Sequence, residues 1–234
     1  MSDLVKLAFV VEGATEALFI ENLLSEILTS NNYTFEKLQQ DQTRRGDFWI
    51  ILETPSINDQ TKYYILIVNC CSDAKVASYI KDHRKNLISE GYRIIIGLLD
   101  LYPESRDDLH AYHYGLKAFI PQKPIETKFI ISIMEIEAWF IAETSHFEKI
   151  DPQLNLEFIK NNLGVDLTST DFEAINHPAD QLNLIYNLVG KAYKKQKSKI
   201  ERTVESLDYA RLYLELPNKL NSLKELVKLI NENI

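Results

Sequence analysis

The chain has 234 residues, of which 45% are apolar and 26% charged, with a formal net charge of −8. This acidic balance excludes a protein that coats nucleic acid through bulk electrostatics, because neutralising phosphates requires clustered Lys and Arg. The adjacent cysteines Cys70 and Cys71 favour neither a mutual disulfide bond nor a zinc site. The first apolar run ends at Glu12, too early for a signal peptide. No apolar stretch reaches the roughly 18 residues that span a bilayer, so we expect a cytoplasmic protein without membrane contact.

The first half of the chain alternates strand-like and helical patterns. The nearly continuous apolar run at 4–11 is typical of a strand buried on both faces of a parallel sheet. Apolar spacing after Thr15, the expected N-cap, predicts a helix over 16–28. In the stretch 33–55, the residues outside a strand expected at 48–52 are predicted to be irregular. Further strands are expected at 48–52, 63–68, 92–99 and 128–134, and further helices near 73–89 and 107–118.

Beyond about residue 136 the strand signal disappears. Helices are expected over 136–142, 156–163, 179–206 and 220–234. Strands that alternate with helices imply crossover connections, so we predict an α/β fold with a mostly parallel, Rossmann-like sheet flanked by helices. An α/β core is expected over residues 1–145, and a helical C-terminal subdomain packed on that core over 146–234.

Acidic residues stand where predicted strands end. Glu12, Asp100 and Glu135 each follow an apolar strand. Glu16 lies one helical turn beyond Glu12, so its carboxylate can return to the same edge. Glu137 can contribute if the chain is still extended there. Because ligands of an open parallel sheet bind at the carboxyl ends of its strands, these acids are candidate site residues.

Carboxylates that converge on one apolar edge repel each other unless a cation is present. Mg²⁺ suits such an edge, because it takes oxygen ligands and is usually held by one or two carboxylates together with substrate phosphate. A metal held there could activate water and stabilise the departing oxygen of a phosphodiester. The alternative is structural, because an acid at a strand end often caps the next helix.

Five short segments resemble those of Toprim proteins. Phe9-Val-Val-Glu-Gly-Ala-Thr-Glu16 resembles the first motif, an apolar strand followed by Glu-Gly, in the form found in OLD-type nucleases. Leu98-Leu-Asp-Leu-Tyr102 lies at the position where Toprim domains carry their Asp-x-Asp motif. Residues 132–140, together with His177-Pro178 and the Tyr-Lys-Lys segment 193–195, are similar to the small stand-alone RloB-like group. The resemblance covers most of the chain, although only short motifs are specific.

The resemblance implies a Toprim-like core and nuclease chemistry that depends on Mg²⁺ or Mn²⁺. It also implies a role in bacterial anti-phage defence beside an ABC-type ATPase partner. By position, Glu12 would act as general acid/base or metal ligand, and Glu16 and Asp100 as metal ligands. Glu135 or Glu137 would be an additional ligand. One departure is Tyr102, which replaces the second acid of Asp-x-Asp and puts a two-metal mechanism in question.

A cationic run in the C-terminal part is a candidate nucleic-acid contact. Its cations could follow the phosphate backbone of DNA or RNA while Tyr193 stacks on a base. The alternative is a solvated helix face. The residues concerned are Tyr193, Lys194, Lys195, Lys197, Lys199 and Arg202.

Two functions from different classes therefore stand side by side. The first is a metal-dependent nuclease in which Glu12, Glu16 and Asp100 are catalytic. The second is a degenerate Toprim scaffold or regulatory subunit of an ATPase complex, which the missing acid at Tyr102 favours. Primase-like or topoisomerase-like strand chemistry ranks last, because the chain has no zinc module and is too short for a topoisomerase gate. Under either main function a homo-oligomer is also allowed.

Overall fold

The computed structural model describes residues 4–28, 32–43, 48–121, 123–194 and 196–234. Its chain divides into two compact units. The first, called the sheet unit, comprises residues 1–99, 107–131 and 228–234. The second, called the helical unit, comprises residues 100–106 and 132–227. The chain thus passes from one unit to the other several times, whereas the sequence analysis placed a single division at residue 145.

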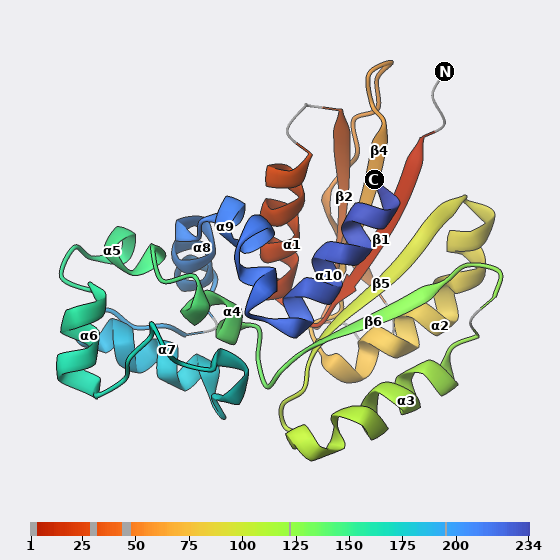
Figure 1. The fold of residues 1–234 in the computed structure, drawn as a ribbon. Helices are drawn as coiled ribbons and strands as arrows, with labels where there is room; N and C mark the ends of the chain where they lie inside the picture. Colours follow the sequence, from red (N-terminus) through yellow and green to blue (C-terminus); the bar gives the residue numbers. More distant parts are fainter. Residues whose placement is uncertain (1–3, 29–31, 44–47, 122, 195) are drawn as a thin grey trace. The chain divides into compact units, whose positions relative to one another are not determined.

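The sheet unit is built on six strands in the order β3-β2-β4-β1-β5-β6 (Figure 1). β1 pairs in parallel with β4 and β5, β2 pairs in parallel with β4, and β2 pairs antiparallel with β3. The expected α/β fold with a mostly parallel sheet is confirmed. The strands are β1 (Val5–Val11), β2 (Tyr33–Gln40), β3 (Trp49–Glu53), β4 (Tyr63–Asn69), β5 (Tyr92–Asp100) and β6 (Thr127–Ser132).

Helices cover both faces of this sheet. The connection from β1 to β2 and the connection from β4 to β5 run in opposite directions across it. Because such crossovers are right-handed, the helices they carry lie on opposite faces. Figure 1 shows α1 (Ala14–Ile27) on one face, with α2 (Asp73–Ser89) and α3 (Leu109–Phe119) on the other. β1 is therefore followed by a helix on one face of the sheet, whereas its neighbours β4 and β5 are followed by helices on the other face.

Burial explains why these segments fold as strands and helices. Residues 7–11 of β1 are fully or almost fully buried, as expected of a strand covered on both faces. On one face α2 contributes Val76 and Ile80 to a core with Ala8 and Val10. Each such buried aliphatic side chain contributes about 1.5–3 kcal/mol relative to an exposed one. The positive φ of Gly91, +81°, ends α2 where the sequence analysis placed its end.

Several local predictions were wrong, three of them in α1, β2 and β6. The N-cap of α1 is Gly13, not Thr15. The segment 33–40, expected to be irregular, is strand β2, whose polar side chains are held by partners: Lys37 contacts Glu21 and Glu53. The edge strand β6 ends at Ser132 instead of Met134, because Met134 has a φ of +64° that no strand accommodates.

The helical unit consists of short helices. The segment 179–206, expected as one helix, forms α7 and α8 with a non-helical stretch between them that contains Gly190 at φ +70°. Among the described residues no helix is long and apolar enough to cross a membrane. The 3-10 turns occupy Arg106–Asp108, Phe172–Ala174 and Leu216–Asn218. Helix α10 (Asn221–Asn233) begins in the helical unit and extends into the sheet unit. The other helices are α4 (Glu137–Ala142), α5 (His146–Ile150), α6 (Leu156–Leu163), α7 (Pro178–Asn187), α8 (Lys197–Ser206) and α9 (Tyr209–Leu214).

Candidate functional site

The turn that follows β1 carries the first two candidate acids. The register pairs Val11 with Asn69 of β4, and the Cys70 N–H donates to the carbonyl of Val11 at 2.9 Å. The parallel pairing therefore ends at Val11, and Glu12 is the first residue beyond it. Glu12 is half-buried. The chain then enters α1 at Ala14 through its N-cap Gly13, so only Glu12 and Gly13 separate the strand end from the helix start.

Glu16 lies in the first turn of α1 and is only 3% exposed. Its Oε2 is 2.9 Å from the position that a Cβ at Gly13 would occupy. The carboxylate is therefore folded back over Gly13, the residue that follows Glu12 in the chain. The partial positive charge at a helix N-terminus favours an anion at this position. Two acidic residues thus flank Gly13 at the carboxyl end of the central strand β1, Glu12 directly before it and Glu16 three residues after it.

The end of β4 adds an amide that the sequence analysis missed. Asn69 is buried; its Oδ1 accepts the Cys71 N–H at 2.9 Å and its Nδ2 donates to Gln39 at 3.4 Å. A polar residue that ends an apolar strand was the available signal.

Burial raises the pKa of Cys70 to about 12, and that of Cys71 is also raised. Both side chains are therefore protonated at neutral pH and unsuited to act as thiolate nucleophiles.

Asp100 is the last residue of β5 and is buried. Its Oδ1 accepts two hydrogen bonds, from the Ser132 hydroxyl and from the Ile136 N–H at 2.9 Å. The aspartate thereby holds the turn between β6 and α4 as well as ending its own strand. Two donors on one oxygen fix the orientation of the carboxylate.

Glu135 and Glu137 are not placed at a strand end. Because β6 ends at Ser132, Glu135 lies in the turn beyond it, and its Oε2 accepts the Ala179 N–H in the first turn of α7 at 2.8 Å. Glu137 is in α4, not in an extended segment, and is fully buried. Its Oε1 accepts the Tyr193 hydroxyl at 2.6 Å. Both acids thus make contacts that hold the helical unit together.

A preassembled metal site is not present within the described ranges. No group of three or more His, Cys, Asp or Glu side chains there is arranged to hold a metal ion. The pair Glu12 and Glu16 therefore does not fit a cage made entirely of protein ligands. It does fit the more open type of Mg²⁺ site, in which one or two carboxylates are completed by water and substrate phosphates.

The cationic run is only partly available to a ligand. Tyr193 is buried against Glu137, so its ring is not exposed for stacking on a base as expected. Arg202 donates to the carbonyl of Ala192 at 2.7 Å and lies over the ring of Tyr186. Of the remaining expected contacts, Lys195 lies outside the described residues, Lys194 and Lys197 are exposed, and Lys199 is half-exposed.

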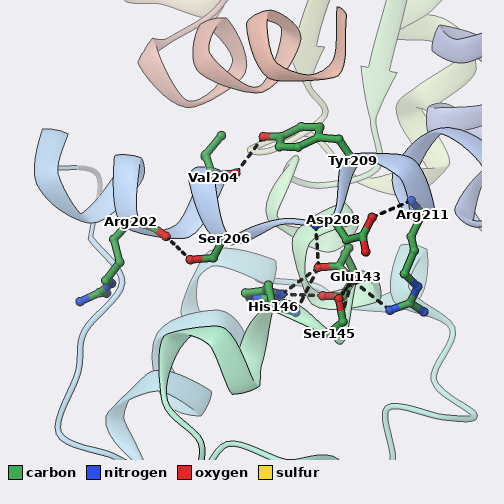
Figure 2. A network of polar contacts seen from close by, with 9 residues as sticks. All are labelled: Glu143, Ser145, His146, Arg202, Val204, Ser206, Asp208, Tyr209 and Arg211. Carbon is green, nitrogen blue, oxygen red and sulfur yellow. Dashed lines mark hydrogen bonds and ion pairs between the residues drawn. The ribbon is translucent and has the colours of Figure 1, made fainter. Parts of the chain in front are cut away.

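The helical unit contains a buried carboxylate that the sequence analysis did not single out. Glu143 is fully buried at the end of α4 (Figure 2). Its Oε1 accepts from the backbone and hydroxyl of Ser145 and from Arg211 at 3.0 Å. Its Oε2 accepts the N–H groups of His146 and Asp208 at 3.1 and 3.2 Å. Through these hydrogen bonds Glu143 joins the α4–α5 turn to the start of α9.

The fold and site together define an α/β protein with a mostly parallel, Rossmann-like sheet and additional C-terminal helices. No protein-family model and no curated protein matches the chain. Among solved structures, a candidate cell surface hydrolase from Lactobacillus plantarum WCFS1 matches with a TM-score of 0.36 and 13% identity. The match covers 62% of this chain and 58% of the other, so this chain spans less than two thirds of that protein. Similarity at this level carries no inference about function.

Proposed function

We propose that the chain is a nuclease that hydrolyses phosphodiester bonds of DNA or RNA with Mg²⁺ or Mn²⁺, and that Glu12, Glu16 and Asp100 supply its carboxylates. The observation that carries the proposal is the Glu16 carboxylate, 3% exposed and folded back over the turn that directly follows β1. Carboxylate oxygens are the ligands that Mg²⁺ and Mn²⁺ favour, and the first turn of a helix suits an anionic side chain. The carboxyl end of a parallel strand is also where ligands of such sheets bind.

The residues of the chain have separate tasks under this proposal. Glu16, fixed by burial, presents a carboxylate oxygen at the turn, and half-buried Glu12 can exchange a proton with solvent or a reacting group. Asp100 is oriented by its two donors, Ser132 and Ile136. When bound, a divalent ion would supply Lewis-acid activation of water and neutralise the scissile phosphate. The exposed Lys194 and Lys197 would contact phosphates of the DNA or RNA.

The biological setting implied by the resemblance belongs to the same proposal. A small Toprim-like nuclease would act in anti-phage defence together with an ABC-type ATPase. Substrate phosphates would complete the ligand set of the proposed metal when nucleic acid is bound.

Replacing Glu16 with Gln is expected to lower the cleavage rate by about 10²-fold or more, because the neutral amide removes the negative charge but keeps the shape. The assay offers plasmid, single-stranded DNA and tRNA with Mg²⁺, with Mn²⁺ or with EDTA. Glu26→Gln is the matched control, because Glu26 is exposed on the same helix. Equal cleavage by the Glu16→Gln and Glu26→Gln variants would contradict the proposal.

Replacing Gly13 with Ala is expected to lower activity while leaving the stability near that of the wild type. The new Cβ would lie 2.9 Å from Glu16 Oε2 and displace that carboxylate. The backbone itself tolerates alanine, because Gly13 is extended, with φ −149° and ψ −174°. Gly115→Ala is the control, since a Cβ there meets nothing within 4 Å. Cleavage rates and melting temperatures of both variants check this, and unchanged cleavage by Gly13→Ala would argue against a role for the turn.

The second candidate function is the degenerate scaffold. Its support is that Asp100, Glu135 and Glu137 each accept hydrogen bonds from their own chain, and that the described residues contain no group of three or more metal-binding side chains. A ligand that binds only the folded state raises its stability. A melting temperature that rises with Mn²⁺ in the wild type but not in Glu16→Gln supports the nuclease. No cleavage and no metal-linked rise would favour the scaffold.

A further inference from the structure

A small cavity lies between helix α2 and the adjoining ends of strands β2 and β3. Its volume is about 70 Å³. Pockets that enclose drug-sized ligands measure roughly 300–1,000 Å³, so this cavity suits a single flat ring whose attached groups stay outside. All of its lining lies within residues 1–99 of the sheet unit. The lining includes Gln40, Trp49, Lys75, Tyr79, Asp82 and His83.

Aromatic rings form the wall of this cavity. The rings of Tyr79 and His83 are stacked, with a centroid distance of 4.0 Å and an angle of 15° between their planes. The indole of Trp49 meets Tyr79 edge to face at 4.7 Å. Tyr79 is buried, whereas Trp49 and His83 are only half-buried, so part of each of these two side chains remains accessible. Aromatic surfaces that neighbours hold in place favour a flat ligand that stacks on them.

Polar groups of both kinds stand beside these rings. The ammonium of Lys75 donates to Oε1 of Gln40 at 2.7 Å, and Gln40 is only 3% exposed. Nδ1 of His83 is 3.0 Å from the carbonyl of Tyr79. Because a carbonyl can only accept, Nδ1 carries the proton in the neutral ring and Nε2 is an acceptor. Together with the carboxylate of Asp82, the cavity thus offers a cationic donor and two acceptors.

A nucleobase is the class of ligand that matches both features. Its faces stack on aromatic rings, and its edge carries donors and acceptors in one plane. A lysine can donate to a carbonyl oxygen or ring nitrogen of a base, while a carboxylate can accept from an amino group. A phosphate matches less well, because its anionic oxygens would meet the carboxylate of Asp82. An aliphatic chain would use neither Lys75 nor Asp82.

The cavity lies at the same edge of the sheet as the candidate acids. The pairing places Val11, Asn69 and Gln39 in one row across β1, β4 and β2. Glu12 and Gln40 are the next residues of β1 and β2, two strands apart, which is about 10 Å at the spacing of neighbouring strands. One or two nucleotides of an extended single strand can cover this distance. A strand that is cleaved at the turn after β1 could therefore place a nearby base in the cavity.

We propose that this cavity is a subsite for one unpaired base of a single-stranded nucleic acid. The base lies against Trp49 and His83, with its edge toward Lys75 and Asp82, while its sugar and phosphates stay outside and lead to Glu12. This inference rests on the proposed nuclease function and narrows its substrate class to strands with unpaired bases. A paired base does not enter, because its partner occupies its edge and its neighbours cover its faces.

Tryptophan fluorescence tests the subsite without cleavage. The chain has two tryptophans, and Trp139 is fully buried, so a change on binding reports Trp49. In EDTA, a single-stranded oligonucleotide is expected to quench the fluorescence. An abasic strand of equal length is expected to bind about tenfold more weakly, because its phosphates are the same but the stacking is lost. Equal affinities for the two strands, or no quenching by the strand with bases, would overturn the proposal.

A pair of lysine variants separates the subsite from general attraction to phosphates. Lys75 and Lys85 are both exposed on α2, so alanine at either position removes the same charge and spares the core. Lys75 lines the cavity, whereas Lys85 lies about 15 Å further along the helix. Lys75→Ala is expected to weaken binding of the strand with bases about fivefold more than Lys85→Ala does. Equal losses in the two variants would contradict the subsite.

The outcome is separable from the test of the nuclease. Quenching that depends on the bases, without cleavage in Mg²⁺ or Mn²⁺, would support the subsite and contradict the proposed cleavage. Cleavage with equal affinity for the strand with bases and the abasic strand would support the nuclease and remove the subsite.

Discussion

Glu143→Ala is expected to destabilise the protein by about 1–3 kcal/mol, the cost of leaving buried hydrogen-bond donors without their acceptor. Glu143 is fully buried and accepts five hydrogen bonds, one of them from the guanidinium of Arg211. Alanine leaves the backbone N–H groups of His146 and Asp208 without this acceptor, whereas Arg211, whose side chain is 30% exposed, keeps its ion pair with Glu215 at 3.2 Å. Unpaired buried donors add their own desolvation cost.

Urea unfolding monitored by circular dichroism measures this loss. Glu148→Ala is the control, because Glu148 is an exposed acid of the neighbouring helix α5, and a surface change of this kind is usually within about 0.5 kcal/mol of the wild type. Glu143→Gln should lie between the two, since the amide keeps one acceptor oxygen but loses the charge. An equal stability of Glu143→Ala and Glu148→Ala would show that the network contributes little.

The importance of Glu143 was not predictable from the sequence, and the reason is distance along the chain. Its partners Asp208 and Arg211 follow it by 65 and 68 residues. Periodicity and local spacing describe only near neighbours. The same limit applies to β2, whose polar residues read as irregular until Lys37 is paired with Glu21 of α1 and Glu53 of β3.

The parts that could be predicted are those set by local pattern. β1, β4, α2 and β5 were expected within about a residue of their observed bounds, because long apolar runs or clear helical spacing defined them. The return of Glu16 over the turn follows from helical geometry alone. Glu135 differs, because the positive φ of Met134 ends the strand early, and a non-glycine residue in that region gives no sequence signal.

His146 predicts the acid sensitivity of the helical unit. It is fully buried, with Nδ1 in a hydrogen bond to the carbonyl of Glu143. Burial lowers its pKa to about 4, since desolvation and the nearby Lys149 outweigh the opposing attraction of Glu143. Within the described part of the chain its Nε2 has no hydrogen-bond partner, so protonation would bury a new N–H without an acceptor.

The direction of the pH effect follows from where the proton binds. The unfolded histidine has a pKa near 6.5 and the folded one near 4, so between these values the unfolded chain binds more protons. Stability contributed by neutral His146 is therefore complete above about pH 6.5 and falls as the pH drops toward 4. The difference between the folded and the unfolded pKa of His146 corresponds to about 3 kcal/mol of folding stability. Asp166, whose pKa is lowered to about 2 by Lys160 and Thr168, responds only below this window.

His146→Asn isolates this effect, because the asparagine amide can donate in place of Nδ1–H but cannot titrate. The variant should be less stable than the wild type at pH 7, since the smaller side chain leaves a cavity. Its urea midpoint should nevertheless change less than that of the wild type between pH 6.5 and 4.5. The slope with pH, not the absolute stability, is the quantity that separates a titrating group from a packing defect. Parallel slopes for the two proteins would assign the acid sensitivity in this range to groups other than His146.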